Sequence, residues 1–287
     1  MASMRDIKRR RSSIQGTQQI TKAMKLVSTV KLQRAKANAE RSKNYFTYMY
    51  DTVNSILKRV GHIEHKYLTA GTCEKKAVVV ITSNRGLAGG YNSNVIKLVS
   101  RNSQWNKEDL IVYALGNKGR EAFTRYGYEV KVCDSDIMES PAYVDAMKLS
   151  DELLQAFAAD EVGEIYLAYT GFKNTVSHVP TLIKLLPVEY AGEEQEPSGK
   201  AEAIMNFEPE DVEALDMIVP KYMASLIYGA LIESVASENG ARMQAMDNAT
   251  SNAEEMIEDL TLKYNRARQG SITQELTEII AGAEALG

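Results

Sequence analysis

The chain has 287 residues, of which 44% are apolar and 25% are charged, and its net charge is −4. These values are ordinary for a globular protein with a sizeable core, and the length favours one or two domains. Two cysteines, Cys73 and Cys133, exclude a disulfide framework; their spacing fits no metal site and favours a reducing compartment. No signal-peptide pattern follows the N-terminal charges, and the best uncharged stretch for a membrane span, residues 222–232, is far too short.

The first predicted element is a helix over residues 1–60, which contain no proline and many good helix formers. Residues 1–44 carry 12 Lys and Arg against two acids, a net charge of +10. The basic run 8–11 lacks neighbouring aromatic residues that would stack on bases, so we expect a solvated helix face. An apolar stripe follows the helix at Met4, Ile7, Ile14, Ile20, Met24, Val27 and Val30.

The histidines give no sign of a metal or catalytic site. His62 and His65 have the spacing of a metal-binding pair, but no third ligand lies nearby, and we expect both to be solvated. His178 falls on a predicted edge strand without a Ser or Cys motif to accompany it. No metal, cofactor or catalytic residue is therefore predicted.

Residues 74–190 are expected to form a Rossmann-like α/β domain with a largely parallel sheet. Buried strands are predicted at 77–83, 110–116, 128–133 and 164–170, with helices near 91–104, 117–126 and 141–160. This alternation is typical of βαβ units. The run 176–190 alternates and contains two prolines, which suits a hairpin edge strand.

A glycine-rich turn follows the first predicted strand. Its glycines, Gly86, Gly89 and Gly90, match neither the dinucleotide fingerprint nor the P-loop, which needs Lys and then Ser or Thr after the last glycine. Arg85 beside the turn is expected to be solvated. The interpretation is a tight strand-to-helix connection without a nucleotide site.

The C-terminal segment, 206–287, is predicted to be a helical arm with one long helix over about 221–287. Residues 206–262 have a net charge of −10, opposite in sign to the N-terminal segment. An apolar and small-residue stripe follows this helix at alternating steps of four and three residues, which is typical of a coiled coil. The opposite charges favour antiparallel pairing with the first helix. The stripe comprises Ile218, Tyr222, Ser225, Gly229, Ile232, Ala236, Asn239, Met243, Met246, Thr250, Ala253, Ile257, Leu260, Tyr264 and Ala267.

Two stretches carry a family resemblance. The N-terminal IQGTQQITKAMKLVSTVKLQRA (14–35) and the C-terminal YNRARQGSITQELTEIIAGAEAL (264–286) resemble the gamma subunit of the bacterial F-type, rotary ATP synthase. SLIYGALIESVASENGARMQAMDNAT (225–250) is similar to the same family. The resemblance covers the whole chain in order.

The resemblance implies a central rotor shaft, present in one copy, that is not catalytic alone and binds no cofactor. Its terminal helices are expected to form an antiparallel coiled coil, with the C-terminal end entering a hexamer of alternating alpha and beta subunits. The α/β domain would lie beside the epsilon subunit and the membrane ring of c subunits. Proton flow would turn ring and shaft and drive ATP synthesis at the beta subunits. The implied location is the cytoplasmic side of the cell membrane, as a peripheral protein attached through the c ring.

Some residues match family positions with known roles. The resemblance implies coupling contacts with beta subunits for Met24, Lys25, Arg242, Arg268, Gln269 and Thr273. Phe207 and Glu208 match a position in the foot that is associated with the c ring. Arg11 replaces an aliphatic residue of many relatives, which disfavours a regular coiled-coil seam at that turn. The cysteine insert of the plastid form is absent, so thiol control is not expected.

The residues alone leave two other hypotheses open. One is a nucleotide-binding α/β enzyme with helical arms, which would bind ATP, ADP or NAD at the Gly86–Gly90 loop. The other is a nucleic-acid-binding coiled coil that uses the basic helix, with an affinity that falls steeply with salt.

Overall fold

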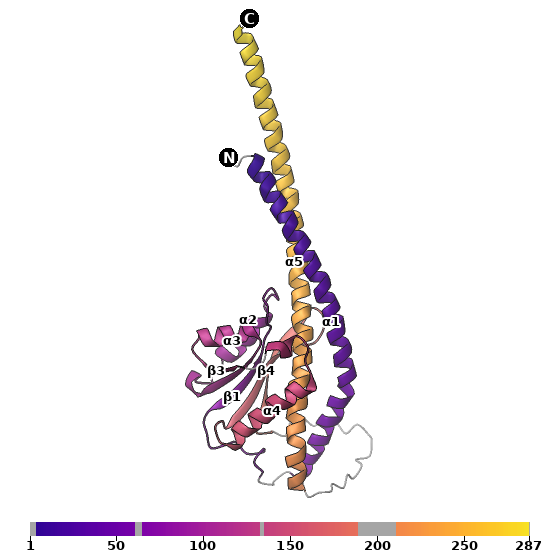
Figure 1. Cartoon of the computed structure of the whole chain (residues 1–287), viewed down its shortest axis with the longest axis vertical. Coiled ribbons are helices and arrows are strands. Elements are labelled where there is room, and N and C mark those ends of the chain that lie inside the picture. Colours follow the sequence, from indigo (N-terminus) through magenta and orange to yellow (C-terminus); the bar gives the residue numbers. More distant parts are fainter. Residues whose placement is uncertain (1–3, 61–64, 133–134, 189–210, 287) are drawn as a thin grey trace. The chain divides into compact units, whose positions relative to one another are not determined.

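A computed structural model describes residues 4–60, 65–132, 135–188 and 211–286. The chain divides into two compact units: unit 1 comprises Met1–Thr29 and Arg242–Gly287, and unit 2 comprises Val30–Ala241. Two long helices, α1 (Met4–Val60) and α5 (Asp211–Leu286), contribute residues to both units (Figure 1).

Unit 2 contains a five-stranded sheet in the order β3-β2-β1-β4-β5. β1, β2, β3 and β4 are parallel, whereas β5 pairs antiparallel with β4 at the edge of the sheet, so the predicted sheet and its hairpin edge strand are confirmed. The strands are β1 (Lys76–Ile81), β2 (Leu110–Leu115), β3 (Glu129–Val132), β4 (Glu164–Phe172) and β5 (His178–Leu186). The helices between them are α2 (Tyr91–Ser100), α3 (Asn117–Arg125) and α4 (Tyr143–Ala158), with short 3-10 turns at Lys107–Asp109 and Ser135–Met138.

The sheet of unit 2 is buried on both faces, which explains the continuous apolar run of β1. Val79 and Ile81 belong to a core shared with α4 and α5, whereas Val78 and Val80 belong to a second core shared with α2 and α3. Figure 1 shows α2 and α3 on one side of the sheet and α4 on the other. Alternate side chains of a strand point to opposite faces, so a strand covered on both sides needs apolar residues at every position.

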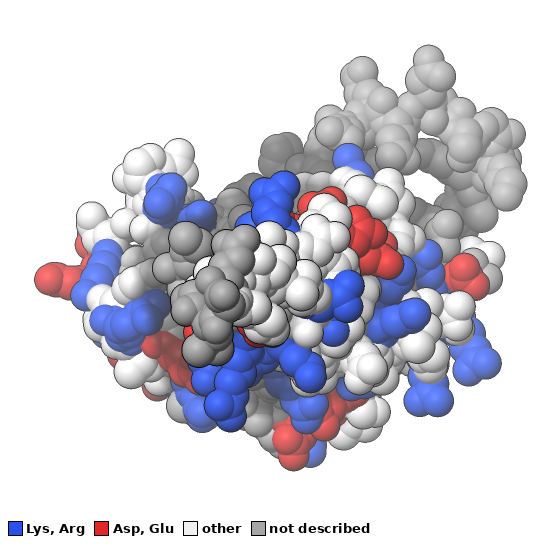
Figure 2. All heavy atoms as spheres, turned by 90° about the horizontal axis from the view of Figure 1, so that it is seen from above, with Lys and Arg blue, Asp and Glu red and all other residues white. Residues whose placement is uncertain are grey.

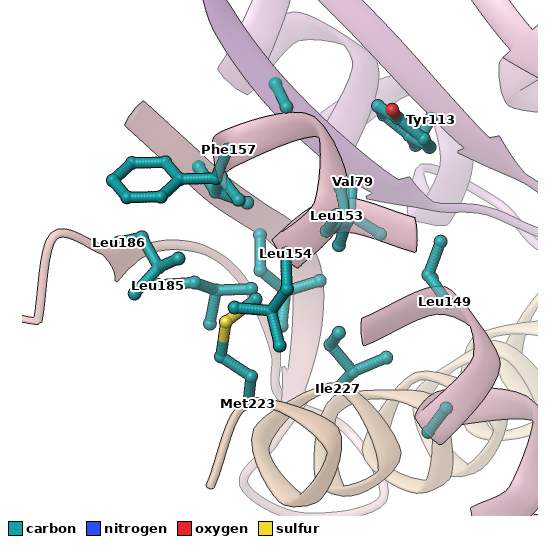
Figure 3. Packing of buried hydrophobic residues seen from close by; sticks show 14 of the residues in the cluster. Val79, Tyr113, Leu149, Leu153, Leu154, Phe157, Leu185, Leu186, Met223 and Ile227 are labelled. Atoms are coloured by element: carbon teal, nitrogen blue, oxygen red, sulfur yellow. The ribbon is translucent and has the colours of Figure 1, made fainter. Parts of the chain in front are cut away.

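The first half of α5 is part of the larger core of unit 2. Met223 and Ile227 of this helix point towards Leu154 of α4 and Leu185 of β5 (Figure 3). Met223 and Ile227 are fully buried. The length and composition of α5 between Leu215 and Ala283 satisfy a test for a membrane span, but half of the qualifying window is buried in the structure, as in core helices of globular proteins.

The long C-terminal helix begins ten residues before the predicted start at 221, and it contains Pro220. Proline lacks an N–H and normally ends or kinks a helix, which is why the sequence favoured a later start. The turns on both sides of Pro220 are fixed by burial, since Leu215, Val219 and Met223 are fully buried. Packing therefore outweighs the loss of one backbone hydrogen bond.

Unit 1 is an antiparallel pair formed by the first part of α1 and the last part of α5. Arg11 contacts Tyr264, whereas Thr21 contacts Thr250, so rising numbers in α1 match falling numbers in α5. The predicted α5 stripe is confirmed in this unit, because its members are buried or half-buried. The expected fold class, an α/β domain flanked by long paired helices, is thus confirmed.

The predicted stripe of α1 is partly wrong. Ile20, Val27 and Val30 have exposed fractions of 62%, 57% and 50%. The seam instead follows strict steps of three and four from Met4, and it includes polar side chains. Its buried or half-buried members in unit 1 are Met4, Ile7, Arg11, Ile14, Gln18, Thr21, Lys25 and Ser28.

Candidate functional site

The residues between β1 and the glycine-rich loop connect the sheet to the start of α3. The first three amides of α3 donate hydrogen bonds to the Asn84 side chain (3.1 Å), the Ser83 carbonyl (3.0 Å) and the Thr82 hydroxyl (2.8 Å). Phosphate sites at helix N-termini use these same amides. Because the chain itself occupies them, the arrangement favours a structural connection.

Glycines at the start of α3 allow this helix to pack closely against Thr82, directly after the end of β1. Gly116 has φ +94°, and a Cβ there would lie 2.1 Å from the Thr82 carbonyl oxygen. At Gly119 a Cβ would lie 2.7 Å from the Thr82 hydroxyl oxygen. At the start of α3, helix and strand therefore leave no room for a phosphate, whereas a Cβ on Gly86 of the glycine-rich loop would meet nothing within 4 Å. Arg85 is exposed, as expected, and its guanidinium lies 3.7 Å from the Glu139 carboxylate.

Two hollows of unit 2 also disfavour a nucleotide. A cavity of about 160 Å³ between α1, the β4–β5 hairpin and α5 is smaller than the roughly 300 Å³ at which ligand pockets begin. A wider depression of about 860 Å³ is rich in carboxylates, which would repel phosphates. It is lined by Glu74, Asn106, Lys107, Glu108, Asp109, Gly127 and Glu129.

One expected solvated histidine is buried. His65 is 6% exposed; its Nδ1 accepts a hydrogen bond from the Tyr67 amide at 3.2 Å, and its Nε2 lies 3.4 Å from a carboxylate oxygen of Asp216. The sequence prediction is wrong here because the segment after α1 packs against the start of α5. His62 lies outside the described residues. Among the described residues, no group of three or more His, Cys, Asp and Glu side chains has the geometry of a metal site.

A polar cluster occupies the middle of the seam in unit 1. The hydroxyls of Thr21 and Thr250 lie 2.8 Å apart, and one turn away Lys25 Nζ forms a 2.6 Å salt bridge with an Asp247 carboxylate oxygen. Each hydroxyl also lies within hydrogen-bond distance of a carbonyl of its own helix, at Gln18 and Met246. Since each has one proton, one hydroxyl donates to the other and the second donates to its own helix. Polar groups in a coiled-coil seam fix the register of the helices at some loss of stability.

Arg11 continues the seam, contrary to the expectation of an irregular turn. Its guanidinium carbon lies 5.6 Å from the centroid of the Tyr264 ring. A guanidinium over an aromatic face contributes a cation–π attraction and buries part of its stem. Arginine therefore fills the role of the aliphatic residue at this turn.

All six candidate coupling residues are described, and all belong to unit 1. Arg268, Gln269 and Thr273 are exposed, and the Thr273 hydroxyl donates to the Gln269 carbonyl at 2.9 Å. Met24, Lys25 and Arg242 are half-buried. The contact of Lys25 with Asp247 was missed by sequence reasoning, although the strict three-four stepping from Met4 would have placed Lys25 in the seam. Phe207 and Glu208, the candidate foot contacts, lie outside the described residues.

The last turns of α5 have no partner among the described residues. Every side chain from Ile272 to Ala283 is exposed. Four large apolar residues on these turns, Ile272, Leu276, Ile279 and Ile280, have exposed fractions of 48% to 68%. Their spacing places them along one side of the helix, and such a patch marks an interaction surface.

Basic side chains are prominent at the surface of the molecule, as the view in Figure 2 shows. In α1 the exposed ones include Arg5, Lys8, Arg9 and Arg10. Arg9 lies 3.4 Å from Asp6 of the same helix. No described aromatic side chain other than the Tyr264 ring under Arg11 is recorded beside this run, so base stacking has little support here.

The sequence matches the ATP synthase family over residues 3–286. It is 64% identical to the ATP synthase gamma chain of Lachnoclostridium phytofermentans, with all of both chains covered. It is 38% identical to the ATP synthase gamma chain, sodium ion specific, of Acetobacterium woodii, with 99% of both chains covered.

Solved structures agree on the fold. A chain of the Euglena gracilis mitochondrial ATP synthase is similar with a TM-score of 0.69 and 20% identity, covering 99% of this chain and 94% of that one. A chain of the Tetrahymena thermophila mitochondrial ATP synthase central stalk and c ring has a TM-score of 0.59 and 25% identity, covering 80% of this chain and 99% of that one.

Proposed function

The chain belongs to the family of ATP synthase gamma chains, and from this premise we propose which of its surfaces carry rotation to the catalytic head. Members of this family form the central stalk of F-type ATP synthases. The chain is therefore a non-catalytic subunit of a membrane-associated complex, in which the beta subunits make and hydrolyse ATP. Rotation of the stalk couples ion flow to that chemistry.

The exposed apolar side of the last turns of α5 supports a contact with the ring of alpha and beta subunits. Ile272, Leu276 and Ile279 are apolar residues on a helix without a partner from the described chain. We assign this part of α5 to the interior of the ring of alternating alpha and beta subunits, where an apolar sleeve would cover it. Residues Glu275 and Glu278 lie on the same turns and are exposed.

Contacts with the beta subunits are assigned to Met24, Lys25, Arg242, Arg268, Gln269 and Thr273. Exposure of Ile20 and Val27 supports the assignment of Met24, because these residues lie four before and three after it on the helix. The exposed Arg268 is suited to charge-assisted contact with acidic loops.

The remaining assignments concern the base of the stalk and its location. We assign residues 1–60 and 206–287 to the helical shaft. Residues 74–190 are assigned to the base of the stalk, with the epsilon subunit and the c ring as partners. Phe207 and Glu208 remain predicted contacts with the c ring. The proposed location is the cytoplasmic side of the cell membrane, peripheral through the ring.

Reconstitution tests the function. ATP hydrolysis by alpha and beta subunits should depend on this chain, and unchanged hydrolysis after its omission would contradict the proposal. Ile279→Glu should lower retention of the chain in the head, because a charge in an apolar sleeve is unfavourable. Leu87→Glu, which changes an equally exposed leucine on a loop of unit 2, is the matched control and should leave retention unchanged.

Met24→Lys tests the coupling contacts. The new charge adjoins Lys25, so we expect assembly to survive while ATP synthesis falls at a given ion-motive force. Synthesis equal to that of the unmodified complex would remove Met24 from the coupling contacts.

A further inference from the structure

β4 extends beyond its neighbour β1. The last pair between them joins Val80 to Ala168, whereas β4 continues to Phe172. On the side of β1, the backbone groups of the last residues of β4 therefore lack a strand partner. Buried backbone groups without a partner are costly, so something else must satisfy them.

Helix α5 supplies the missing partners. The buried Ser237 hydroxyl donates to the Thr170 carbonyl at 3.1 Å, and the Thr170 amide donates to the Ser234 hydroxyl at 3.4 Å. Two residues further along β4, the Phe172 amide donates to a Glu233 carboxylate oxygen at 3.3 Å.

The other side of the hairpin fits this arrangement. Thr170 is paired with Pro180 of β5, which has no amide to donate. The amide and carbonyl of Thr170 instead go to α5. A proline in the edge strand is thus compatible with full hydrogen bonding of β4.

A side chain of β5 also fits into a notch on α5. His178 Nε2 is buried and has no hydrogen-bond partner among the described residues. A Cβ on Gly240 would lie 2.6 Å from this nitrogen and 3.5 Å from the Thr175 carbonyl. Burial lowers the pKa of His178, and an imidazolium would carry an Nε2 proton without an acceptor. The neutral ring therefore acts as a wedge against the glycine.

Helix α1 holds the same hairpin end from another element. Lys36 Nζ lies 5.2 Å from the centroid of the Phe172 ring and donates to the Thr175 hydroxyl at 3.4 Å. The Phe172 ring in turn lies 6.1 Å from the His178 ring. The hairpin end is thus held by both long helices within unit 2.

We propose that this hairpin clamp is the joint that prevents α5 from turning about its own axis against the sheet. The clamp is defined by Thr170, Phe172 and His178 of the hairpin and by Glu233, Ser234, Ser237 and Gly240 of α5. Apolar contacts are non-directional and allow sliding, whereas hydrogen bonds and a wedge in a notch resist rotation. The inference rests on the rotor function, because only a rotor loads this joint with torque.

Gly240→Ala tests the clamp in the complete complex. Glycine-to-alanine changes inside helices normally stabilise, but here the added Cβ displaces the His178 ring. Exchange of the Thr170 and Phe172 amides should accelerate roughly fivefold or more, as expected for an overpacked contact. In liposomes, the complex should move fewer ions per ATP hydrolysed. Gly16→Ala, whose Cβ would meet nothing within 4 Å, is the control and should change neither readout.

A second variant separates a joint from a merely structural contact. His178→Ala combined with Gly240→Ala removes the clash and lets the hydrogen bonds of Thr170 and Phe172 form again, but it also removes the wedge, so ion transport per ATP should recover in part relative to Gly240→Ala alone. Equal transport ratios in wild type and Gly240→Ala, with only the amount of complex reduced, would refute the clamp, and so would a double variant as poorly coupled as Gly240→Ala. Failure of the rotor function would look different, because the purified complex would then lack the chain.

Discussion

The two units use the same pair of helices in different ways. In unit 2, α5 is surrounded by α4 and the sheet, and successive turns contribute fully buried residues such as Leu215, Val219 and Met223. In unit 1, the same helix buries about one residue per two turns, at Met246, Ala253 and Leu260, along a seam with α1. The stability of one helix therefore changes along its length: a broad core fixes the first part, and a narrow seam with polar members fixes the second.

The largest effect is expected in the core of unit 2. Ile227→Ala should lower the free energy of unfolding by about 2–5 kcal/mol, because it leaves a cavity among fully buried side chains. Chemical denaturation of the full chain would measure this loss. A loss below that of Ile279→Ala, which truncates a 68% exposed side chain, would contradict the contrast between the two parts of α5.

A smaller and local effect is expected in the seam. Leu260→Ala should weaken unit 1 by about 1.5–3 kcal/mol, the value of burying one aliphatic side chain. Hydrogen exchange should accelerate in the first turns of α1 and in the turns of α5 around Leu260. If exchange in β1 and β2 accelerated to the same degree, the two units would unfold as one and the comparison would fail.

Acid should affect unit 2 through His178. Its pKa is lowered by burial, so the unfolded chain binds the proton more readily than the folded one. Stability is therefore complete above pH about 6.5 and falls as the pH decreases through that value towards the lower folded pKa, by at most ~1.4 kcal/mol per pH unit.

Lys36 and Glu233 are charged groups that contact this hairpin end, and Lys173 belongs to its turn. Burial raises the pKa of Glu233. That shift acts in the opposite direction, lowering stability as the pH rises above about 4.5, the usual carboxyl value. Comparison with His178→Gln isolates the histidine: unfolding between pH 7.5 and 5.5 should depend less on pH in the variant. Identical profiles would exclude a contribution from His178.

The smallest effect is expected for the salt bridge in unit 1. Lys25 and Asp247 side chains are 39% and 54% exposed, so their coupling in a double-mutant cycle should be about 0.2–1 kcal/mol. The coupling should decrease with added salt. If the coupling free energy stayed constant up to molar salt, the pair would have to be more buried than it is in the structure, and the prediction would be wrong.

Much of the fold was predictable because burial on both sides leaves a clear pattern. The run from Ala77 to Ile81 could only be an inner strand, and Pro180 and Pro187 pointed to an edge strand. The α5 stripe was clear in unit 1, whereas in unit 2 no residue from Tyr222 to Ala241 is exposed and the stripe is not distinguished by burial.

The seam of α1 was harder to predict because apolar character and burial separate there. Thr21 and Ser28 are buried, whereas Ile20 and Val27 are exposed. A sequence shows which side chains are apolar, but the face that meets α5 depends on the register of two segments more than 200 residues apart. Exposed apolar residues such as Ile20 and Val27 are expected where another subunit covers the helix.

The hairpin clamp was not predictable for a related reason. Its existence depends on where β1 stops relative to β4, and this is set by register rather than composition. Ser234 and Ser237 resemble ordinary small helix residues until the free edge of β4 is known. The candidate coupling residues, by contrast, came from the family resemblance, and only their exposure and the Lys25–Asp247 pair were added by the structure.

The bare final turns of α5 have a consequence for the time before assembly. A newly made chain presents Ile272, Leu276, Ile279 and Ile280 to water on turns that no other described part of the chain covers. Such a segment frays and is prone to self-association, so its folding is completed by the subunits that enclose it. Biogenesis of the complex is therefore expected to favour early capture of this end, with unassembled copies lost to aggregation or proteolysis.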